Sequence, residues 1–295
     1  MRSWRHASTK SRSESGIRTV EEATAWGWDK LQDVTDRPRR EAEILLADHL
    51  HCSRAILLAH PERILSSADV EGFASDIRCR ASGEPLPYVR GRIEFLGLDI
   101  SVTPDVLIPR PETEQLVERG RAWLAHHPRC TILDVGTGSG CIAVALAANE
   151  RDVELWASDR SVAALRVAQR NARRHNVADR ITFFVGDLLR PVQGPLGLIL
   201  SNPPYIAQEA WSTLPRSVRR EPRMALLSGS DGLHAMRHLL RQAASRLGTP
   251  GAVYVEIGER QGDAARALAR AAFPSAEIAI LPDLAGKDRV LQIIR

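Results

Sequence analysis

The chain has 295 residues, a length that corresponds to about two domains. Hydrophobic residues make up 44% and charged residues 26%, which excludes a disordered chain, a collagen-like fibre and a disulfide-stapled miniprotein. The net charge is only +4 and no apolar run approaches the ~18 residues of a membrane span, so we expect a soluble protein whose charge alone does not indicate nucleic-acid binding.

Residues 1–16 differ from the rest of the chain in composition. They are rich in serine and arginine, contain one acid, Glu14, and show no apolar periodicity. This composition predicts a disordered extension. An organelle transit peptide has a similar composition and stays open as an alternative.

The cysteines bear on metal binding and on location. They lie far apart and form no CxxC pair, which predicts neither a zinc site nor a disulfide framework. A reducing cytoplasm is therefore the expected compartment. The four residues are Cys52, Cys79, Cys130 and Cys141.

Residues 17–84 have the periodicity of helices. Ala42, Leu45 and Leu46 belong to a set of apolar residues that recur at helical spacing. Pro38 fits the first turn of a helix, and Ser66–Asp69 is typical of another helix start. We expect a small helical bundle of the kind that recognises a partner or braces a catalytic domain.

Residues 85–115 are expected to form a hairpin and a connector. The stretch Ile93–Val102 alternates around Gly97 and predicts a short hairpin. The segment Leu107–Glu114 then places an arginine and two acids beside two prolines. A plain linker would explain the prolines but not the charged residues.

Residues 116–295 alternate between strand and helix patterns. Helices fall between most of the strands, which predicts a parallel, doubly wound α/β sheet. The predicted strands are 131–135, 153–158, 181–185, 198–201, 252–257, 277–281 and 290–294.

A glycine-rich loop follows the first of these strands. It reads Gly136-Thr137-Gly138-Ser139-Gly140 and leads into a predicted helix. Glycines let the backbone turn tightly and lie against a ligand, although a purely structural turn would also use them. A dinucleotide loop would need glycine at position 141, where this chain has cysteine. The shorter spacing suits a nucleoside ligand without a pyrophosphate, such as S-adenosylmethionine.

Three acids end successive predicted strands. Asp134, Asp159 and Asp187 should meet at one carboxyl edge, where ligands bind in open α/β sheets. Asp159 has the position of an acid that accepts hydrogen bonds from ribose hydroxyls. Asp187 is placed to reach an adenine amino group, with Leu188 against the ring.

The tetrapeptide Asn202-Pro203-Pro204-Tyr205 ends the fourth predicted strand and indicates the chemistry. The Asn202 side-chain oxygen and the Pro203 carbonyl can both accept from one planar NH₂ group, and Tyr205 offers a face for stacking. Two such acceptors would turn the nitrogen lone pair toward a methyl donor. The acceptor is then adenine N6 in a nucleic acid or a glutamine amide in a protein, and the tetrapeptide leaves both open.

Taken in order, these motifs resemble the release-factor glutamine methyltransferase (PrmC/HemK) family over residues 20–295. The resemblance implies a Rossmann-like class I methyltransferase sheet of seven strands with a small N-terminal helical domain. It also implies methyl transfer from S-adenosylmethionine to the glutamine of the Gly-Gly-Gln motif in class I peptide chain release factors. The matching segments are Glu84–Tyr88 with Gly91, Leu107–Glu114, Gly136–Gly140, Asn202–Tyr205, Glu221–Arg223, Asp231–Leu233, Asp283–Gly286 and Asp288-Arg289.

The resemblance implies a role for each motif. Asn202, Pro203, Pro204 and Tyr205 would form the glutamine clamp, with Arg110 of the connector as a further substrate contact. The residues implied to bind the cofactor are Asp134, Gly136, Thr137, Gly138, Ser139, Gly140, Asp159, Asp187, Leu188 and Asn202.

The resemblance also implies the partner and the setting. The helical domain would grip the release factor away from the glutamine. We expect a cytoplasmic monomer without direct contact to nucleic acid or membrane. The chain departs from the family where Leu188 replaces an aromatic residue of some members and where Ser228–Ser230 replaces a double glycine.

Three alternatives remain. Relatives that methylate a ribosomal-protein glutamine share the loop and the clamp but usually lack the Arg-Pro-Glu-Thr-Glu form of the connector. An adenine N6 methyltransferase would need a basic target surface, whereas arginines here alternate with acids. A binding module that retains the fold would bind the cofactor without turnover.

Overall fold

The computed structural model describes residues 14–150 and 153–295, and the chain divides into two compact units, residues 1–90 and 91–295. Residues 1–13 of the expected extension lie outside the described residues. Its described end, Glu14–Gly16, forms a short 3-10 helix, and the Glu14 carboxylate accepts hydrogen bonds from Arg78 Nη1 at 2.7 and 2.8 Å. Among the helices of the described ranges, none has both the length and the apolar character that crossing a bilayer requires.

The first unit is helical, as the sequence predicted. Pro38 occupies the first turn of the second helix, and Ser66 caps the fourth. The Ser66 hydroxyl accepts from the Asp69 backbone N–H at 3.1 Å, while the Asp69 carboxylate accepts from the Ser66 N–H at 3.0 Å. The helices are α1 (Val20–Leu31), α2 (Pro38–His49), α3 (Arg54–Ala59), α4 (Ser67–Ala81) and α5 (Leu86–Arg90).

The core of this unit forms where α1, α2 and α4 meet. Trp26 of α1 packs edge-on against Phe73 of α4, with ring centroids 6.1 Å apart. A Cβ on the adjacent Gly27 would lie 2.9 Å from Ala42 on α2 and 2.9 Å from the Phe73 ring. Only glycine therefore allows α1 to approach both helices this closely.

The second unit begins with the expected hairpin and connector. Strands β1 (Arg92–Phe95) and β2 (Leu98–Ser101) pair antiparallel, and the intervening Leu96 and Gly97 both have positive φ angles. The connector ends in the 3-10 helix η2 (Pro111–Thr113), which continues directly into α6 (Glu114–Leu124).

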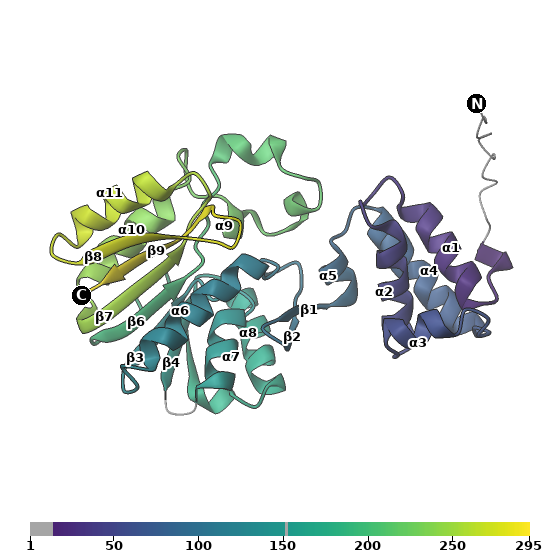
Figure 1. Ribbon diagram of the computed structural model, residues 1–295, viewed down its shortest axis with the longest axis horizontal. Helices are drawn as coiled ribbons and strands as arrows, with labels where there is room; N and C mark the ends of the chain where they lie inside the picture. The colour runs from purple at the N-terminus through teal and green to yellow at the C-terminus, as the bar shows by residue number, and fades with distance from the viewer. Residues whose placement is uncertain (1–13, 151–152) are drawn as a thin grey trace. The chain divides into compact units, whose positions relative to one another are not determined.

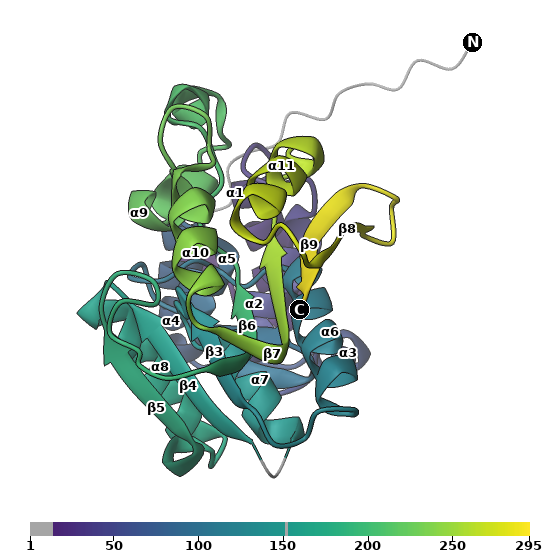
Figure 2. The same ribbon diagram turned by 90° about the vertical axis from the view of Figure 1, so that its left-hand side faces the viewer.

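All seven predicted strands form one sheet, in the order β5-β4-β3-β6-β7-β9-β8 (Figure 1). The first five in this order are parallel, and the central strands lie side by side in the orthogonal view as well (Figure 2). The strands are β3 (Thr131–Val135), β4 (Glu154–Asp159), β5 (Ile181–Val185), β6 (Leu196–Ser201), β7 (Leu247–Glu256), β8 (Glu277–Pro282) and β9 (Asp288–Ile294).

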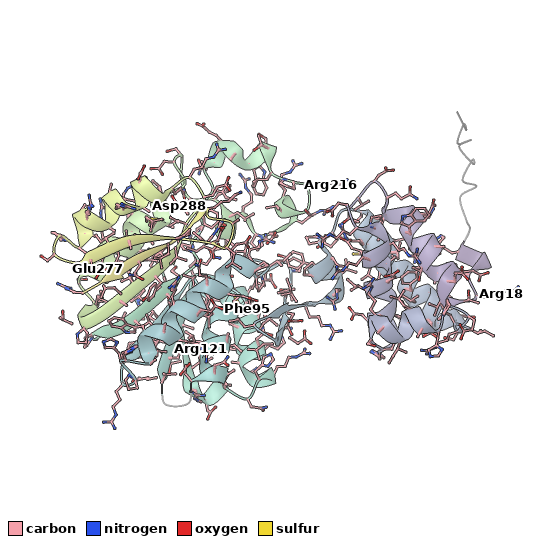
Figure 3. The ribbon with its side chains drawn as sticks, viewed as in Figure 1. Arg18, Phe95, Arg121, Arg216, Glu277 and Asp288 are labelled. Carbon is pink, nitrogen blue, oxygen red and sulfur yellow. The ribbon has the colours of Figure 1, made fainter. Side chains whose placement is uncertain are left out.

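The expectation of a wholly parallel sheet was wrong for β9, which runs antiparallel to β7 and to β8. Strand β8 ends at Pro282, and after a tight turn β9 starts at Asp288, which is labelled in Figure 3. In that turn the Asp283 carboxylate accepts from the backbone N–H of Ala285 at 2.9 Å and of Lys287 at 3.0 Å. A parallel pairing would need a long crossover connection, and a turn this short permits only a hairpin.

Helices cover both faces of the sheet. Alternate residues of β6 show the division: Leu198 and Leu200 meet α6 at Gly120, whereas Ile199 joins the core cluster that contains Leu239 of α10. Helices α6, α7 and α8 are neighbours on one face, and α10 and α11 on the other. The remaining elements are α7 (Cys141–Asn149), α8 (Val162–Arg174), η3 (Ala178–Arg180), η4 (Gln208–Thr213), η5 (Val218–Arg220), α9 (Arg223–Leu226), α10 (His234–Ala244) and α11 (Gly262–Ala272).

This topology determines where a ligand can bind. Strand β3 follows the connector, the next strands along the chain pair on one side of it, and β6 pairs on its other side. The order of the strands therefore reverses at β3. In open α/β sheets, ligands occupy the crevice beyond the carboxyl ends of the strands at such a reversal.

Candidate functional site

A cavity of about 540 Å³ lies at this carboxyl edge. Val135, Asp159 and Ser201 line it from the ends of β3, β4 and β6. Further lining comes from the connector and from the segment 222–229 that contains α9. The volume is in the range of small-molecule and cofactor sites.

The glycine-rich loop lines the cavity with backbone. Gly136 and Gly138 have φ angles of +72° and +56°, and a Cβ on either would meet open space rather than protein. Thr137 and Ser139 also line the cavity and are themselves buried. The loop therefore leaves room against its backbone for a ligand.

Asp134 does not line the cavity. It is fully buried, and its Oδ2 accepts from the Thr137 hydroxyl at 2.6 Å and from the Ala143 backbone N–H at 3.2 Å. Burial raises the pKa of Asp134 to about 7. The residue thus ties the loop to the first turn of α7, which is a different place from the ligand contact expected of it.

Asp159 lies in the cavity wall. Its Oδ2 accepts from the Gly138 backbone N–H at 2.9 Å and its Oδ1 from the Ser161 N–H at 2.8 Å. Burial raises the pKa of this carboxyl. Each oxygen retains accepting capacity, which suits a pair of hydroxyl donors.

Asp187 and Leu188 also line the cavity. The Asp187 carboxylate is half exposed and lies 3.7 Å from the guanidinium of Arg190. Leu188 has a φ angle of +56°, which is uncommon for a residue with a side chain. Its carbonyl accepts from the Ser158 hydroxyl at 2.9 Å, which holds the strained backbone in place.

The donor and acceptor groups of this wall fit S-adenosylmethionine. A loop of glycine backbone, the carboxylates of Asp159 and Asp187, and the apolar side chains of Leu188 and Ile142 surround one cavity. These groups match a ribose with two hydroxyls, an adenine with an amino group and an apolar ring face.

Asn202, Pro203 and Pro204 line the same cavity beside this wall. The Asn202 Nδ2 donates to the hydroxyl of Thr113, 3.0 Å away, and Thr113 lines the cavity as well. The Asn202 Oδ1 is buried, and no donor in the described chain reaches it. Buried acceptors are rarely left unpaired, so this oxygen is a candidate for a substrate donor.

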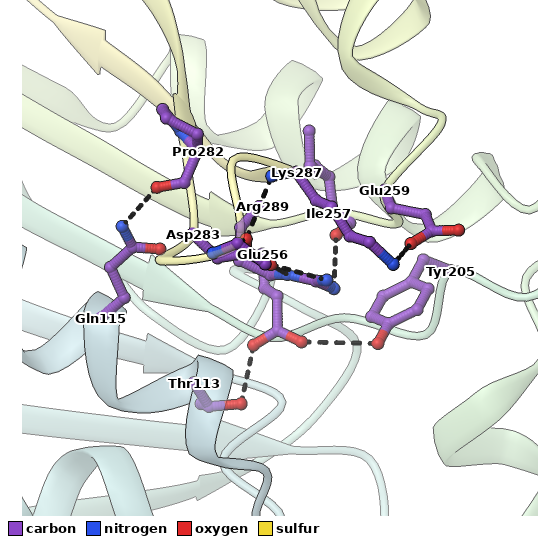
Figure 4. A network of polar contacts seen from close by, with 11 residues as sticks. Thr113, Gln115, Tyr205, Glu256, Ile257, Glu259, Pro282, Asp283, Lys287 and Arg289 are labelled. Atoms are coloured by element: carbon purple, nitrogen blue, oxygen red, sulfur yellow. Dashed lines mark hydrogen bonds and ion pairs between the residues drawn. The ribbon is translucent and has the colours of Figure 1, made fainter.

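Tyr205 does not line the cavity, contrary to its expected role as a stacking face. Its hydroxyl donates to Oε1 of Glu256 at 3.4 Å (Figure 4). Burial, with the nearby Glu256 charge, raises the pKa of Tyr205 to about 12. The backbone carbonyl of Tyr205 accepts from Gln261 at 3.0 Å. Both contacts hold the end of the tetrapeptide against the protein.

Arg110 and Gly140 are the other predicted site residues that do not line the cavity. The Arg110 guanidinium pairs with the buried carboxylate of Glu221, which also accepts from the Ile108 N–H at 3.0 Å. Arg110 therefore braces the connector against the segment that follows Glu221. A Cβ on Gly140 would lie 2.9 Å from Ala168, so this glycine serves the approach of α7 to α8.

Thr113 and Glu256 are among the polar residues in or beside the cavity that the sequence analysis does not identify. Thr113 lies inside the connector motif, which carries no separate signal for its side chain. Glu256 ends β7, is 1% exposed, and accepts from the Thr113 hydroxyl at 2.7 Å (Figure 4). The signal for Glu256 is a single acid at the end of an otherwise apolar strand, the same signal that predicts Asp159.

Two family descriptions match parts of the chain. Residues 22–91 match the PrmC N-terminal domain, and residues 116–220 match the methyltransferase small domain. The first match falls largely on the helical unit. The second covers the glycine loop, the acids at the strand ends and the tetrapeptide at 202–205.

The chain is similar over most of its length to proteins named release factor glutamine methyltransferase. The relative from Moorella thermoacetica is 46% identical over 255 residues, which are 86% of this chain and 90% of that protein. A relative from Nitratidesulfovibrio vulgaris is 42% identical and covers 87% of this chain and 88% of its own. One from Bordetella pertussis is also 42% identical, with 86% and 93% covered.

Solved structures add the fold alone. The hMettl16 catalytic domain aligns with a TM-score of 0.53 at 16% identity, over 79% of this chain and 84% of that one. A T. thermophilus 16S rRNA methyltransferase, solved in complex with AdoMet and guanosine, aligns with a TM-score of 0.51 at 16% identity, over 69% of this chain and 49% of its own. The predicted Rossmann-like methyltransferase fold is confirmed.

Proposed function

Because the chain belongs to the release factor glutamine methyltransferase family, we propose that it methylates a glutamine side-chain amide in a class I peptide chain release factor. The acceptor is the glutamine of the Gly-Gly-Gln motif. The chain is a methyltransferase, and its cofactor is S-adenosylmethionine.

One observation carries the chemical class of the acceptor, a planar NH₂ group: the buried, unpaired Oδ1 of Asn202. The family to which the chain belongs favours a glutamine amide over adenine N6 as the source of that group. A primary amide nitrogen has two N–H donors, and Asn202 Oδ1 accepts one while the Pro203 carbonyl accepts the other. Holding both N–H bonds fixes the plane of the amide and the direction of its lone pair. This orientation contributes to the rate because the nitrogen is otherwise a poor nucleophile.

The clamp also acts electrostatically. When bound, S-adenosylmethionine supplies a methyl group on a positively charged sulfur. As the amide nitrogen gains the methyl group, positive charge develops on its two N–H bonds. Acceptors on those bonds stabilise the transition state more than the ground state. No base has to remove a proton first, because the nitrogen can lose it to water after transfer.

The cofactor is held by the glycine loop and the strand-end acids. Asp159 takes the ribose hydroxyls, Asp187 the adenine amino group, and Leu188 the ring face. Gly136 and Gly138 leave the backbone open to the ligand. Asp134 supports this loop from below through Thr137.

We assign the grip on the release factor to the helical unit, residues 17–84. Large apolar side chains exposed on it support a role in protein binding. They are Trp28, Ile56, Leu58 and Ile64. A monomer in the cytoplasm, with no direct contact to nucleic acid or membrane, remains our prediction.

The experiment is methyl transfer with a mapped product. The purified chain is incubated with labelled S-adenosylmethionine and an unmethylated class I release factor, and peptide mass spectrometry locates the label. We expect one methyl group on the Gly-Gly-Gln glutamine and none on a release factor in which alanine replaces that glutamine.

Other outcomes would contradict the proposal. Label on a ribosomal-protein glutamine or on adenine in a nucleic acid, with none on the release factor, would establish one of the alternative substrates. Cofactor binding without transfer to any translation protein would indicate a binding module.

A further inference from the structure

Three hydrogen bonds connect the clamp to a carboxylate that does not line the cavity. Asn202 Nδ2 donates to Thr113 Oγ1 at 3.0 Å, and the Thr113 hydroxyl donates to Glu256 Oε2 at 2.7 Å. The other oxygen of Glu256 accepts from the Tyr205 hydroxyl at 3.4 Å. Figure 4 shows Glu256 between Thr113 and Tyr205.

The number of hydrogens available in this hydrogen-bond network determines which group donates and which accepts at each step. A threonine hydroxyl has one hydrogen, and an ionised carboxylate can only accept. The Thr113 hydrogen is therefore committed to Glu256, and toward Asn202 the hydroxyl can only accept. Asn202 must turn its NH₂ group to Thr113, which leaves Oδ1 as the free end of the amide.

We propose that Glu256 is a positioning residue that determines which end of the Asn202 amide is offered to the substrate. The inference rests on the proposed function, in which Asn202 Oδ1 accepts from the glutamine nitrogen. Glu256 does not touch the substrate and acts through Thr113.

The direction matters because the two ends of an amide have opposite polarity. With Oδ1 free, Asn202 accepts an N–H bond of the substrate amide. With the amide turned over, an NH₂ group would face the substrate NH₂ group, and two donors cannot pair. The overturned clamp would hold neither the plane nor the lone pair of the acceptor nitrogen.

The surroundings of Glu256 favour its role as an acceptor. Each carboxylate oxygen accepts one hydrogen bond, from Thr113 or from Tyr205, and hydrogen bonds of this kind favour the ionised form of the carboxyl. Burial raises the pKa of Glu256, and the bond from Thr113 and the positive charge of Arg289 oppose this rise. Arg289 is in turn held by Asp283 at 3.2 Å.

Replacing the Glu256 carboxylate by an amide keeps the shape of the side chain but no longer fixes which groups donate and which accept between Glu256, Thr113 and Asn202. In Glu256→Gln, the new NH₂ group can donate to Thr113, whose hydrogen is then free to donate to Asn202 Oδ1. Both orientations of Asn202 become satisfied. The matched control is Glu259→Gln, the same substitution three residues later, at an exposed carboxylate that pairs with Lys287 and not with Thr113.

The kinetic test uses the full-length chain with release factor and S-adenosylmethionine. Glu256→Gln should lower kcat roughly 10- to 100-fold, with cofactor Kd and thermal midpoint close to wild type. Glu259→Gln should leave all three unchanged. Thr113→Val should lower kcat, and Thr113→Ser, which keeps the hydroxyl, should restore it.

A double variant tests whether Glu256 acts through Thr113. Once Thr113→Val is present, adding Glu256→Gln should change kcat less than about twofold, because the path is already broken. Losses that multiply in the double variant would overturn the proposal. So would a Glu256→Gln enzyme as fast as wild type, and in that case methylation by the wild type would leave the proposed function standing.

A spectroscopic readout makes the test independent of activity. The side-chain NH₂ of Asn202 can be followed by NMR in asparagine-labelled protein without cofactor or substrate, and assigned from its loss in Asn202→Ala. Glu256→Gln should shift this signal and speed its hydrogen exchange, and Glu259→Gln should not. An unchanged Asn202 signal in Glu256→Gln would refute the inference even if no release factor were methylated.

Discussion

The side chains of Asn202 and Thr113 are joined by a hydrogen bond of 3.0 Å although 89 residues separate them in the chain. Thr113 is the last residue of η2, the 3-10 helix that ends the connector, and Asn202 directly follows the last residue of β6. The bond places a segment that precedes the sheet beside the tetrapeptide at its carboxyl edge. The clamp is therefore built from two distant parts of the chain.

Removing the Asn202 side chain should abolish most catalysis and leave cofactor binding intact. Asn202→Ala deletes an acceptor of the developing charge, so kcat should fall by roughly 10² to 10³. Calorimetry should give a cofactor Kd near that of wild type. Asn149→Ala, at the exposed end of α7, is the control and should be unaffected. Equal losses of rate and cofactor affinity in Asn202→Ala would contradict its assignment to the acceptor.

Asp159→Asn should weaken cofactor binding. One end of the new amide is an NH₂ group, which would face the N–H of either Gly138 or Ser161, and it accepts fewer ribose hydroxyls. We expect Kd to rise by about tenfold or more. Glu154→Gln, at the exposed opposite end of the same strand, is the control. An unchanged Kd by calorimetry would remove Asp159 from the site.

Two glycines of the loop should respond differently to alanine. Gly140 has a φ angle of +81°, and an added Cβ would lie 2.9 and 3.0 Å from Cβ and Cα of Ala168. Gly140→Ala should therefore destabilise the fold by about 3 kcal/mol. Gly136→Ala meets open space, so only its φ angle of +72° matters, at about 1 kcal/mol. Urea denaturation compares the two variants, and equal losses of stability would contradict the packing argument.

The stability of the cofactor-free protein should depend on the charge of Asp134. Its folded pKa of about 7 lies above the ordinary value of 3.8, so the folded state binds the proton more tightly than the unfolded state. Tighter proton binding by Asp134 adds at most about 4 kcal/mol to the free energy of unfolding. This stabilisation is fully present below about pH 4 and is lost as the pH rises toward 7. Asp134→Asn removes the titration. In urea denaturation, the free energy of unfolding of Asp134→Asn should rise relative to that of wild type from pH 5 to pH 8. A difference between the two free energies that does not change with pH would refute this.

The fold could be predicted well because its determinants are local. Apolar runs bounded by turns give all seven strands, and Pro38 and Ser66 mark two helix starts. The direction of β9 is also determined locally, because the turn around Asp283 is too short for a crossover connection. The alternation of strands and helices upstream predicts a parallel strand at this position, and the short turn prevents it.

The site could be predicted only as a set of neighbours. Strand ends bring Asp134, Asp159 and Asn202 to one edge, but a strand end does not say which way a side chain turns. Asp134 turns to the loop, because two donors await it at Thr137 and Ala143. Tyr205 turns to Glu256, which lies 51 residues further along the chain. The residues around Tyr205 in the sequence do not predict a hydrogen-bond partner this far along the chain.

Helix α7 has a consequence for how this protein tolerates change. Every residue from Cys141 to Ala147 is buried, whereas α11 buries only Gly262, Ala265 and Ala269. A saturation library should therefore show a rise and fall of tolerance every three to four positions along α11. Along the first two turns of α7 that rhythm should vanish, and polar substitutions should be rejected at each position in turn. The first two turns of the helix that follows the glycine loop therefore present no solvent-exposed face on which a polar substitution would be tolerated.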